Sequence, residues 1–341
     1  MAKVEFLFID RRSVESLLPQ TGQLLEIVES GLLAHAKGEV VLPPKGHLDL
    51  DDRFKGHFNI LPGYAAPPSL APAGMAGVKV IGDYVHNYRQ GLPSEIALLT
   101  LYDPKTGAPL ALLDATVLTW LRTGAVTGIG AKYLARPESR IVGHIGARGT
   151  AFGNLAALAS LFPLEEIRIA SHRPETREKL AREVEAKLGV RALAVDSVEA
   201  ACRDADIVVE ATRLEKPEIL IRDPWLKPGS LLVTYGWVMA VDPATVAGVE
   251  KRVVDDWAQC RKGGALYPLI ASGALRDEHI HAEIGQIASG DRPGRTEPHE
   301  RILFWHRGFA ISDIVLGAWF LAEARRKGAG QLLTLWEGLD D

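Results

Sequence analysis

Short apolar runs alternate with amphipathic segments through the middle of the chain. The runs are 141–142, 167–171, 192–195, 207–209, 231–233 and 252–254. One segment between them begins at Pro174, places Leu180 and Val184 on one face and ends at Gly189, which is typical of a helix. Continuous apolar strands separated by helices predict a parallel sheet that is covered on both faces. We therefore expect a doubly wound α/β domain here.

The residues before and after this region follow a different pattern. A helix is expected over 13–37, followed by a stretch rich in proline and glycine over 43–77. Strands in mixed or antiparallel pairing are expected at 78–81, 96–102 and 110–113. An amphipathic helix at 311–327 is expected to return to these strands. This pattern predicts a second, discontinuous α+β domain.

Composition and charge exclude several classes of protein. The chain of 341 residues is long enough for roughly two domains. Its net charge of −4 gives no basic surface for nucleic acid or an anionic membrane. Its two cysteines imply no disulfide framework and favour a reducing compartment. Neither a signal peptide nor a run of membrane-spanning length is evident in the sequence. We expect a cytoplasmic protein without nucleic-acid or membrane partners.

A turn containing glycine follows the first apolar run. It reads Gly146-Ala147-Arg148-Gly149-Thr150, and a helix-like pattern of leucines comes after it. A strand, a tight turn and a helix N-terminus in this order offer backbone N–H groups to the pyrophosphate of a dinucleotide. Arg148 occupies the position of the usual second glycine. It therefore either points away from the cofactor or supplies a guanidinium to it.

Further motifs follow one another along the chain. They are 77–79, Asn87, 91–94, 121–125, 205–212, 285–296 and 308–313. Together with the glycine turn, they resemble the ornithine cyclodeaminase/mu-crystallin family over most of the chain from Ala76 onward. The resemblance implies a Rossmann-type domain that binds a nicotinamide cofactor and a discontinuous α+β domain for substrate binding and homodimerisation. We place the boundaries at 1–122 with 308–341 for the α+β domain, and at 123–307 for the Rossmann domain.

The resemblance assigns three cationic side chains to the substrate. Lys79 matches the family's catalytic lysine, and its amine can protonate an imine or accept a proton during oxidation; the alternative is a strand lysine that reaches solvent. Arg122 matches the arginine that holds the substrate carboxylate with its planar fork. Lys45 stands where relatives often carry a second carboxylate-binding arginine, and it supplies charge without the fork.

Other residues are expected at the cofactor. Ser94 and Thr123 match hydroxyl positions that contact it in relatives, although small hydroxyl residues also cap helices. Thr212 ends a strand on the side where ligands of parallel sheets bind. His306 precedes the last motif and contacts substrate or cofactor, or else it has a hydrogen-bonded packing role. No histidine pair has metal-ligand spacing with a carboxylate partner, so we expect no metal site.

The choice between NAD and NADP depends on the residues after the second strand of the doubly wound domain. Ser171, His172 and Arg173 stand there, without the acidic residue that would bind the adenosine ribose hydroxyls. A missing carboxylate and a nearby cation admit a 2′-phosphate. The sequence therefore favours NADP over NAD, unless Arg173 points to solvent.

The loop after the run at 231–233 departs from the family. Cyclodeaminases carry an aspartate there, whereas this chain has Gly236 and Trp237 in a shorter loop, with Asp242 as the candidate replacement. The missing carboxylate argues against a cyclodeaminase that recycles its cofactor, and Trp237 suggests a reshaped pocket. The presence of both Lys79 and Arg122 argues against a non-catalytic, mu-crystallin-like binding protein.

The sequence thus predicts an NAD(P)-dependent amino-acid dehydrogenase or imino-acid (ketimine) reductase. Hydride would pass between C4 of the nicotinamide and the α-carbon of a small amino, imino or oxo acid.

Overall fold

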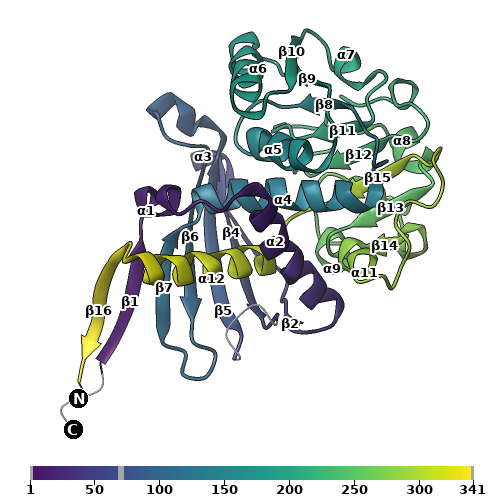
Figure 1. Cartoon of the computed structure of the whole chain (residues 1–341). Coiled ribbons are helices and arrows are strands. Elements are labelled where there is room, and N and C mark those ends of the chain that lie inside the picture. Colours follow the sequence, from purple (N-terminus) through teal and green to yellow (C-terminus); the bar gives the residue numbers. More distant parts are fainter. Residues whose placement is uncertain (1–2, 68–72, 339–341) are drawn as a thin grey trace. The chain divides into compact units, whose positions relative to one another are not determined.

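The chain forms two compact units, each with its own sheet and helices (Figure 1). The computed structural model describes residues 3–67 and 73–338. We call Met1–Arg122 with Phe309–Asp341 the discontinuous unit, and Thr123–Gly308 the continuous unit. No helix within the described residues has both the length and the apolar character needed to cross a membrane.

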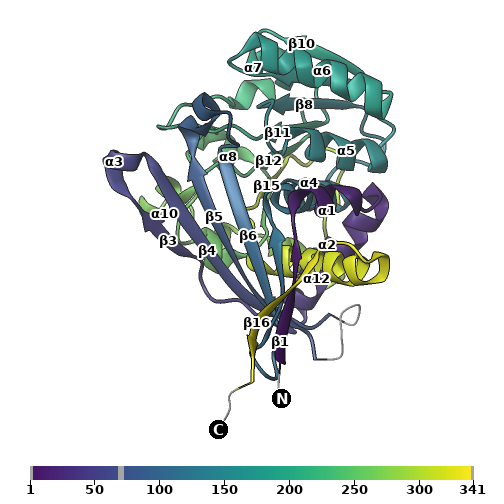
Figure 2. The same ribbon diagram turned by 90° about the vertical axis from the view of Figure 1, so that its left-hand side faces the viewer.

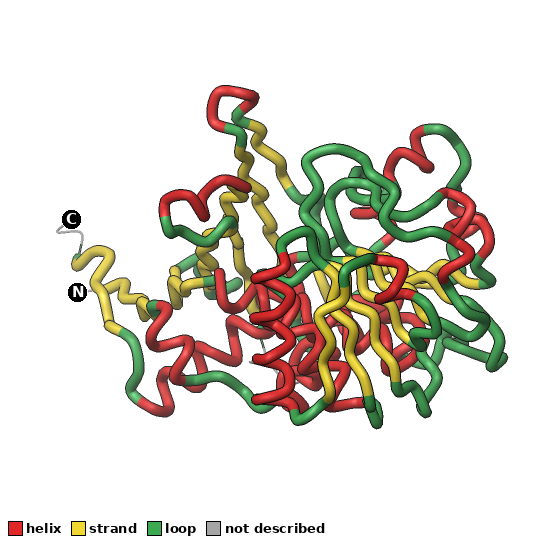
Figure 3. The backbone as a smooth tube through the Cα atoms, turned by 90° about the horizontal axis from the view of Figure 1, so that it is seen from above, coloured by secondary structure: helices red, strands yellow, loops and turns green. Residues whose placement is uncertain are grey.

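A parallel sheet of eight strands forms the centre of the continuous unit, in the order β10-β9-β8-β11-β12-β15-β13-β14. Its strands are β8 (Ile141–Ile145), β9 (Glu166–Ala170), β10 (Arg191–Val195), β11 (Ile207–Glu210), β12 (Leu231–Thr234), β13 (Lys251–Val254), β14 (Ala282–Glu283) and β15 (Ile302–Trp305). Every residue of β11, β12 and β15 is buried, as a sheet covered on both faces requires. Figure 3 shows these strands side by side, with helical segments against them. The predicted Rossmann-type fold class is confirmed.

The strand order places the carboxyl ends of β8 and β11 at the switch point of the sheet. From β8 the chain proceeds to β9 and β10 on one side, and then returns to β11 and β12 on the other. Ligands of doubly wound sheets bind outside the carboxyl ends of the strands at such a reversal.

Helices connect the strands of this unit. They are α4 (Thr116–Leu134), which begins in the discontinuous unit, α5 (Ala151–Leu161), α6 (Pro174–Leu188), α7 (Val198–Cys202), α8 (Pro243–Gly248), α9 (Trp257–Cys260), α10 (Tyr267–Ala271) and α11 (Ile284–Ala288), with 3-10 turns η2 (Asp223–Trp225) and η3 (Asp277–His279). α6 begins at Pro174 and is followed by Gly189 in the left-handed region, as expected from the sequence.

The sheet of the discontinuous unit is mixed, with the order β16-β1-β7-β6-β5-β4-β2 and with β3 paired to β4. Its strands are β1 (Lys3–Ile9), β2 (Val40–Val41), β3 (Gly46–Asp49), β4 (Gly56–Ala65), β5 (Met75–Tyr84), β6 (Glu95–Tyr102), β7 (Pro109–Asp114) and β16 (Gln331–Glu337). β1 and β7 are parallel, and the other pairs are antiparallel. The first and last strands of the chain, β1 and β16, lie side by side (Figure 2).

The helices of this unit are α1 (Arg11–Ser16), α2 (Thr21–Ala36), α3 (Asp51–Phe54) and α12 (Ala310–Lys327), with the 3-10 turn η1 (Val85–Gln90). The expectation of one helix over 13–37 is wrong, because Pro19 lies between α1 and α2. Proline removes a backbone donor and disfavours helical backbone in the residue before it.

α12 packs against α2 and against strands β4, β5 and β6 (Figure 1). The contact with the sheet is close at Gly317, where an added Cβ would lie 2.4 Å from a methyl carbon of Leu99 on β6. This close approach brings the first turns of α12 onto the sheet face that includes Lys79. The C-terminal helix therefore returns to the N-terminal strands, as expected.

Candidate active site

Lys79 lies inside the discontinuous unit and does not reach solvent. β5 places it on the face that α12 covers, where the residue is 1% exposed. Its Nζ donates a hydrogen bond to Oδ1 of Asp313 over 2.6 Å and another to Oγ1 of Thr119 over 3.3 Å. A buried ammonium needs partners of this kind, because an unpaired charge in the interior is costly.

Arg122 contacts the same carboxylate as Lys79. It lies on α4, one turn after Thr119, and its Nε donates to Oδ1 of Asp313 over 3.1 Å. Its terminal N–H groups make no hydrogen bond within residues 3–67 and 73–338. The guanidinium is thus fixed through Nε, while the donors that suit a carboxylate ligand remain available.

The surroundings of Lys79 lower its pKa from 10.5 to about 8. Burial is the largest cause, since it disfavours the ammonium, and the nearby guanidinium of Arg122 acts in the same direction. Asp313 opposes both by attracting the ammonium. An amine with such a pKa is present in both protonation forms near neutral pH, as a group that donates and accepts protons requires.

Asp313 is the third residue of this cluster, and from the sequence alone it could either cap the C-terminal helix or face the site. It lies in the first turn of α12, but the helix begins after Phe309 and the carboxylate does not cap it. Asp313 is fully buried, and its Oδ2 has no hydrogen-bond partner among the described residues. The sequence does contain a signal for Asp313, because it is an acidic residue within the otherwise apolar segment 309–322. Such a side chain is buried only when it is paired.

Lys45 and Ser94 also belong to the discontinuous unit. Lys45 is half-buried directly before β3, and Ser94 is half-buried directly before β6. The carbonyl of Ser94 accepts a hydrogen bond from the backbone of Tyr84 over 2.8 Å. The structure therefore gives each a place at a strand start, and their contacts with substrate and cofactor stay predictions.

The glycine turn lies in the continuous unit, between β8 and α5, at the switch point of the sheet. Gly146 has φ of 105° and Gly149 has φ of 58°, values that favour glycine. An added Cβ at Gly146 would lie 2.5 Å from the carbonyl oxygen of Ala211, which follows β11, whereas one at Gly149 would meet no atom within 4 Å. Ala147 is half-buried and Arg148 is exposed. The turn thus packs closely on its inner side and is open on its outer side.

Thr150 precedes α5, and its hydroxyl makes no capping hydrogen bond within the described chain. Instead it pairs with the hydroxyl of Tyr235 at 2.6 Å, and Asn154 donates to the same hydroxyl over 2.6 Å. Asn154 also contacts His144 Nε2 at 3.0 Å, and burial lowers the pKa of His144 to about 4. Tyr235, which sequence reasoning missed, therefore connects the loop after β12 to the start of α5 through hydrogen bonds with Thr150 and Asn154.

His306 is 1% exposed at the end of β15. Its ring stacks on Tyr235 with centroids 4.6 Å apart, and its Nε2 shares a hydrogen bond with Thr127 at 3.2 Å. These contacts describe the packing role of His306, and its contact with a cofactor stays a prediction.

Thr123, on α4, is 6% exposed. Trp237 is 48% exposed, with the guanidinium carbon of Arg307 lying 5.1 Å from the centre of its ring.

The residues after β9 form a local hydrogen-bond network. The hydroxyl of Ser171 donates to the carbonyl of Arg173 over 3.0 Å and pairs with Thr176 at 2.8 Å. His172 and Arg173 are exposed. Arg177 donates to the carbonyl of Ser171 over 3.0 Å and pairs with Asp196. The carboxyl end of β9 thus exposes His172 and Arg173 to solvent, while the hydroxyl of Ser171 is held in local hydrogen bonds.

Glu210 is a second buried carboxylate that sequence reasoning missed. It is the last residue of β11, is 0% exposed and pairs in register with Ile145 of β8 and Thr234 of β12. The backbone N–H of Thr212 donates to Oε1 over 2.8 Å, and the Thr212 hydroxyl donates to the same oxygen. Thr234 donates to Oε2 over 2.7 Å. Burial raises the pKa of Glu210, and hydrogen bonds from Thr212, Thr234 and the backbone of Gly236 oppose that shift.

Asp242 is the candidate replacement for the aspartate expected in cyclodeaminases. Its carboxylate accepts a hydrogen bond from the backbone of Ala244 over 2.9 Å and caps α8. These contacts give Asp242 a structural role, and its replacement of the family aspartate stays a prediction.

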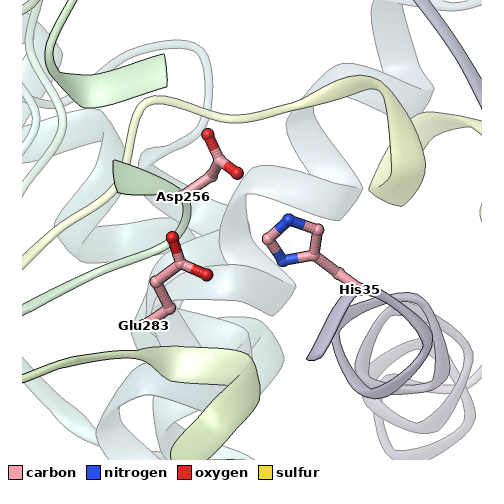
Figure 4. A group of neighbouring side chains, drawn as sticks. All are labelled: His35, Asp256 and Glu283. Atoms are coloured by element: carbon pink, nitrogen blue, oxygen red, sulfur yellow. The ribbon is translucent and has the colours of Figure 1, made fainter. Parts of the chain in front are cut away.

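Two further carboxylates of the continuous unit, Asp256 and Glu283, are neighbours (Figure 4). Asp256 accepts from the backbone of Gln259 over 2.6 Å at the start of α9, and Glu283 accepts from the backbone of Trp257 over 2.8 Å. His35, also drawn in Figure 4, belongs to the discontinuous unit, where its ring centre lies 5.4 Å from that of Phe309. Each side chain thus has a structural role within its own unit, and the expectation of no metal site stays a prediction.

Comparison with known proteins agrees with this arrangement. The model of the ornithine cyclodeaminase/mu-crystallin family matches residues 5–328. Alanine dehydrogenase of Archaeoglobus fulgidus is 32% identical over 333 residues, which are 96% of this chain and 98% of that protein.

Two solved structures are similar along nearly their whole length. The Delta(1)-pyrroline-2-carboxylate reductase of Thermococcus litoralis, in complex with NADH and L-proline, is 31% identical with a TM-score of 0.89, covering 96% of this chain and 99% of that one. An archaeal alanine dehydrogenase dimer with bound NAD is 30% identical with a TM-score of 0.88, covering 97% and 100%.

Proposed function

The chain belongs to the ornithine cyclodeaminase/mu-crystallin family, and from that membership we propose that it is a nicotinamide-dependent amino-acid dehydrogenase or imino-acid reductase. The observation that carries the proposal is the buried cluster in which Lys79 and Arg122 share the carboxylate of Asp313. Burying two cations and an anion is costly. A buried lysine whose pKa is lowered, as that of Lys79 is, is typical of functional sites.

Each member of the cluster has a chemical task. The terminal N–H groups of Arg122 would hold the substrate carboxylate and thereby fix the α-carbon. Lys79 would accept a proton from the substrate amine during oxidation and return it during reduction, for which a pKa of about 8 is suitable. Asp313 would keep both cations in place and hold the ammonium form of Lys79 at the site.

The glycine turn of the continuous unit fits a dinucleotide. Gly146 and Gly149 have backbone conformations that favour glycine, the outer side of the turn is open, and α5 begins at the switch point. The backbone of residues 146–150 would hold the pyrophosphate at the helix N-terminus. A bound nicotinamide supplies or accepts the hydride. The two similar solved structures contain NADH and NAD, and the preference for NADP stays a prediction that rests on Ser171, His172 and Arg173.

A cyclodeaminase is the less favoured alternative. Trp237 stands in the loop that carries an aspartate in those enzymes, and Asp242 is engaged as the cap of α8. A cyclodeaminase must also bind the second amine of its substrate, and this loop, all of whose residues the structure describes, offers no free carboxylate for that amine.

We also propose a homodimer formed through the sheet of the discontinuous unit. Ile60, Val80 and Leu98 lie in one row across β4, β5 and β6, and they are 37%, 40% and 48% exposed. They occupy the face opposite Lys79, since neighbouring residues of a strand point to opposite sides. An exposed apolar row of this kind is typical of a protein contact, and a second copy of this chain is the partner that we propose.

The function is tested by mixing the purified chain with NADH and, separately, NADPH. Each mixture receives a panel of 2-oxo acids with ammonia or methylamine, or a cyclic ketimine, and nicotinamide absorbance is followed. Amine-dependent or ketimine-dependent oxidation supports the proposal. Release of ammonia from ornithine without net oxidation would instead identify a cyclodeaminase, and cofactor binding without any turnover would identify a binding protein.

A further inference from the structure

The carboxylate of Glu210 is buried, and none of its hydrogen-bond partners in the described part of the chain is a cation. Its donors are the hydroxyl and backbone N–H of Thr212, the hydroxyl of Thr234 and the backbone of Gly236, and all four are neutral. All four donate hydrogen bonds to the carboxylate, which stabilises its anionic form and opposes the rise in pKa that burial causes. Burying a carboxylate in this way costs several kcal/mol. The position is therefore unexpected for a residue that only fills the core.

The donors come from two loops that leave the same edge of the sheet. Thr212 follows β11, while Thr234 ends β12 and Gly236 follows it. Gly236 comes so close that an added Cβ would lie 3.2 Å from Oε2 of Glu210. The carboxylate therefore fixes the start of both loops against each other.

These loops lie beside the switch point. Glu210 pairs in register with Ile145 of β8, directly before the glycine turn, and the backbone of Ala211 packs against Gly146. In doubly wound sheets the adenosine half of a dinucleotide lies toward the second and third strands, here β9 and β10. The nicotinamide half consequently belongs on the side of β11 and β12, where Glu210 gathers the two loops.

We propose that Glu210 is a positioning residue for the nicotinamide half of the cofactor and that its buried charge favours the oxidised form. The inference rests on the proposed function, since it requires a dinucleotide at this edge. Oxidised nicotinamide carries a positive charge that the reduced ring lacks. A fixed negative charge in the interior, where screening is weak, attracts the cationic ring and leaves the neutral ring nearly unaffected.

The test compares the Kd values of the oxidised and reduced cofactor for the wild-type protein and Glu210→Gln, measured by fluorescence or calorimetry without substrate. Glutamine keeps the size of the side chain and removes its charge. We expect the Kd of the oxidised cofactor to rise about fivefold to tenfold more than that of the reduced cofactor, a factor typical of one partly screened charge pair. Glu215→Gln is the matched control, because it removes the same charge from an exposed position of the loop after β11. It should leave both Kd values unchanged.

An equal increase in the Kd of the oxidised and the reduced cofactor would show that Glu210 acts only on the structure of the site. Unchanged Kd values would show that Glu210 does not affect cofactor binding at all. Either result overturns the inference. If the wild-type chain binds neither form, the proposed function fails instead. Thr234→Val provides a second variant in case Glu210→Gln does not fold. It removes one neutral donor and keeps the charge, so both Kd values should rise by the same factor. A change in their ratio of more than about threefold, beyond what one neutral hydrogen bond explains, would contradict the assignment of the discrimination to charge.

Discussion

Nζ of Lys79 and Oδ1 of Asp313 lie 2.6 Å apart, although 234 positions separate the two residues in sequence. The contact joins β5, an inner strand of its sheet, to the first turn of the C-terminal helix α12, and both side chains are buried. A C-terminal helix that returns to the first strands is therefore required for the site as well as for the core. The pair fixes the amine, and the shared carboxylate also fixes Arg122.

Replacing Lys79 with methionine should abolish most of the turnover. The substitution retains an unbranched side chain of similar length in the buried position and removes the group that transfers the proton. We expect kcat to fall by about a thousandfold, within the range of general acid–base catalysis, while the Kd of NADH changes little. Stopped-flow turnover and fluorescence titration measure the two quantities. The control is Lys105→Met, in an exposed turn of the same unit; a Lys79→Met enzyme as active as this control would refute the catalytic role.

The rate of amino-acid oxidation should rise with pH through about 8. Lys79 must be neutral to accept a proton, and its pKa is lowered from 10.5 to about 8, mainly by burial and then by Arg122. Reduction of the imine requires the ammonium, so its rate should fall over the same interval.

The Asp313→Asn variant tests whether this pH dependence arises from the cluster of Lys79, Arg122 and Asp313. The carboxylate raises the pKa of Lys79, so its removal should move both pH limbs to lower pH. The measurement is the pH profile of kcat in each direction, together with a thermal melt to confirm folding. A profile that stays at the wild-type position, or moves upward, would separate Asp313 from the proton transfer.

Arg122→Lys tests the binding of the substrate carboxylate. Lysine keeps the charge but lacks the planar fork, and it cannot both contact Asp313 through Nε and present paired N–H groups. We expect KM for the amino or imino acid to rise by about tenfold to a hundredfold, the equivalent of roughly 1.4–2.8 kcal/mol. The Kd of NADH, measured without substrate, should be unchanged. Loss of NADH binding by a folded variant would place Arg122 at the cofactor instead.

The fold could be predicted from the sequence to the extent that its strands are continuous and apolar. β11 and β12 are buried at every residue, and β8 is buried after its first residue, so their apolar runs stand out from the polar segments between them. β4 did not stand out, because it includes Pro62 and Gly63 in a stretch rich in turn-forming residues, yet it pairs along ten residues with β5. Long-range pairing overrides local propensity in such a strand.

The site could be predicted only where a family motif marks a residue. The motifs that contain Lys79 and Arg122 mark both residues. Whether Asp313 belongs to the site depends on which turn of α12 faces the sheet, and the motif does not indicate this. Glu210 and Tyr235 were missed for a related reason. Their roles arise from contacts with Thr234 and Thr150 on other elements, and no spacing along one element indicates such contacts.

Arg173 should determine the preference between NADPH and NADH. The end of β9 presents Ser171 and Arg173 where enzymes specific for NAD carry an acidic residue, and a 2′-phosphate would gain a charge-assisted hydrogen bond from the guanidinium. Arg173→Ala should raise the Kd of NADPH by about tenfold and leave the Kd of NADH nearly unchanged. The control for a general loss of positive charge is Arg182→Ala, because Arg182 is exposed on α6, the helix that follows Arg173. Equal Kd values for NADPH and NADH in the wild-type protein would show that the residues after β9 do not select NADP.

A charge introduced into the exposed apolar row should separate the two copies of the chain. Leu98 is 48% exposed and lies beside Val80 on β5, which in turn lies beside Ile60 on β4. An aspartate at position 98 would be desolvated without a partner if a second copy covers this face, at a cost of several kcal/mol. Light scattering after size-exclusion chromatography should therefore report a dimer for the wild-type protein and a monomer for Leu98→Asp. The control is Leu335→Asp, because Leu335 is 56% exposed on β16, at the far edge of the same sheet. If Leu98→Asp remains a dimer with an unchanged melting temperature, the copies associate through another surface; if only Leu335→Asp dissociates, that surface is the edge formed by β16.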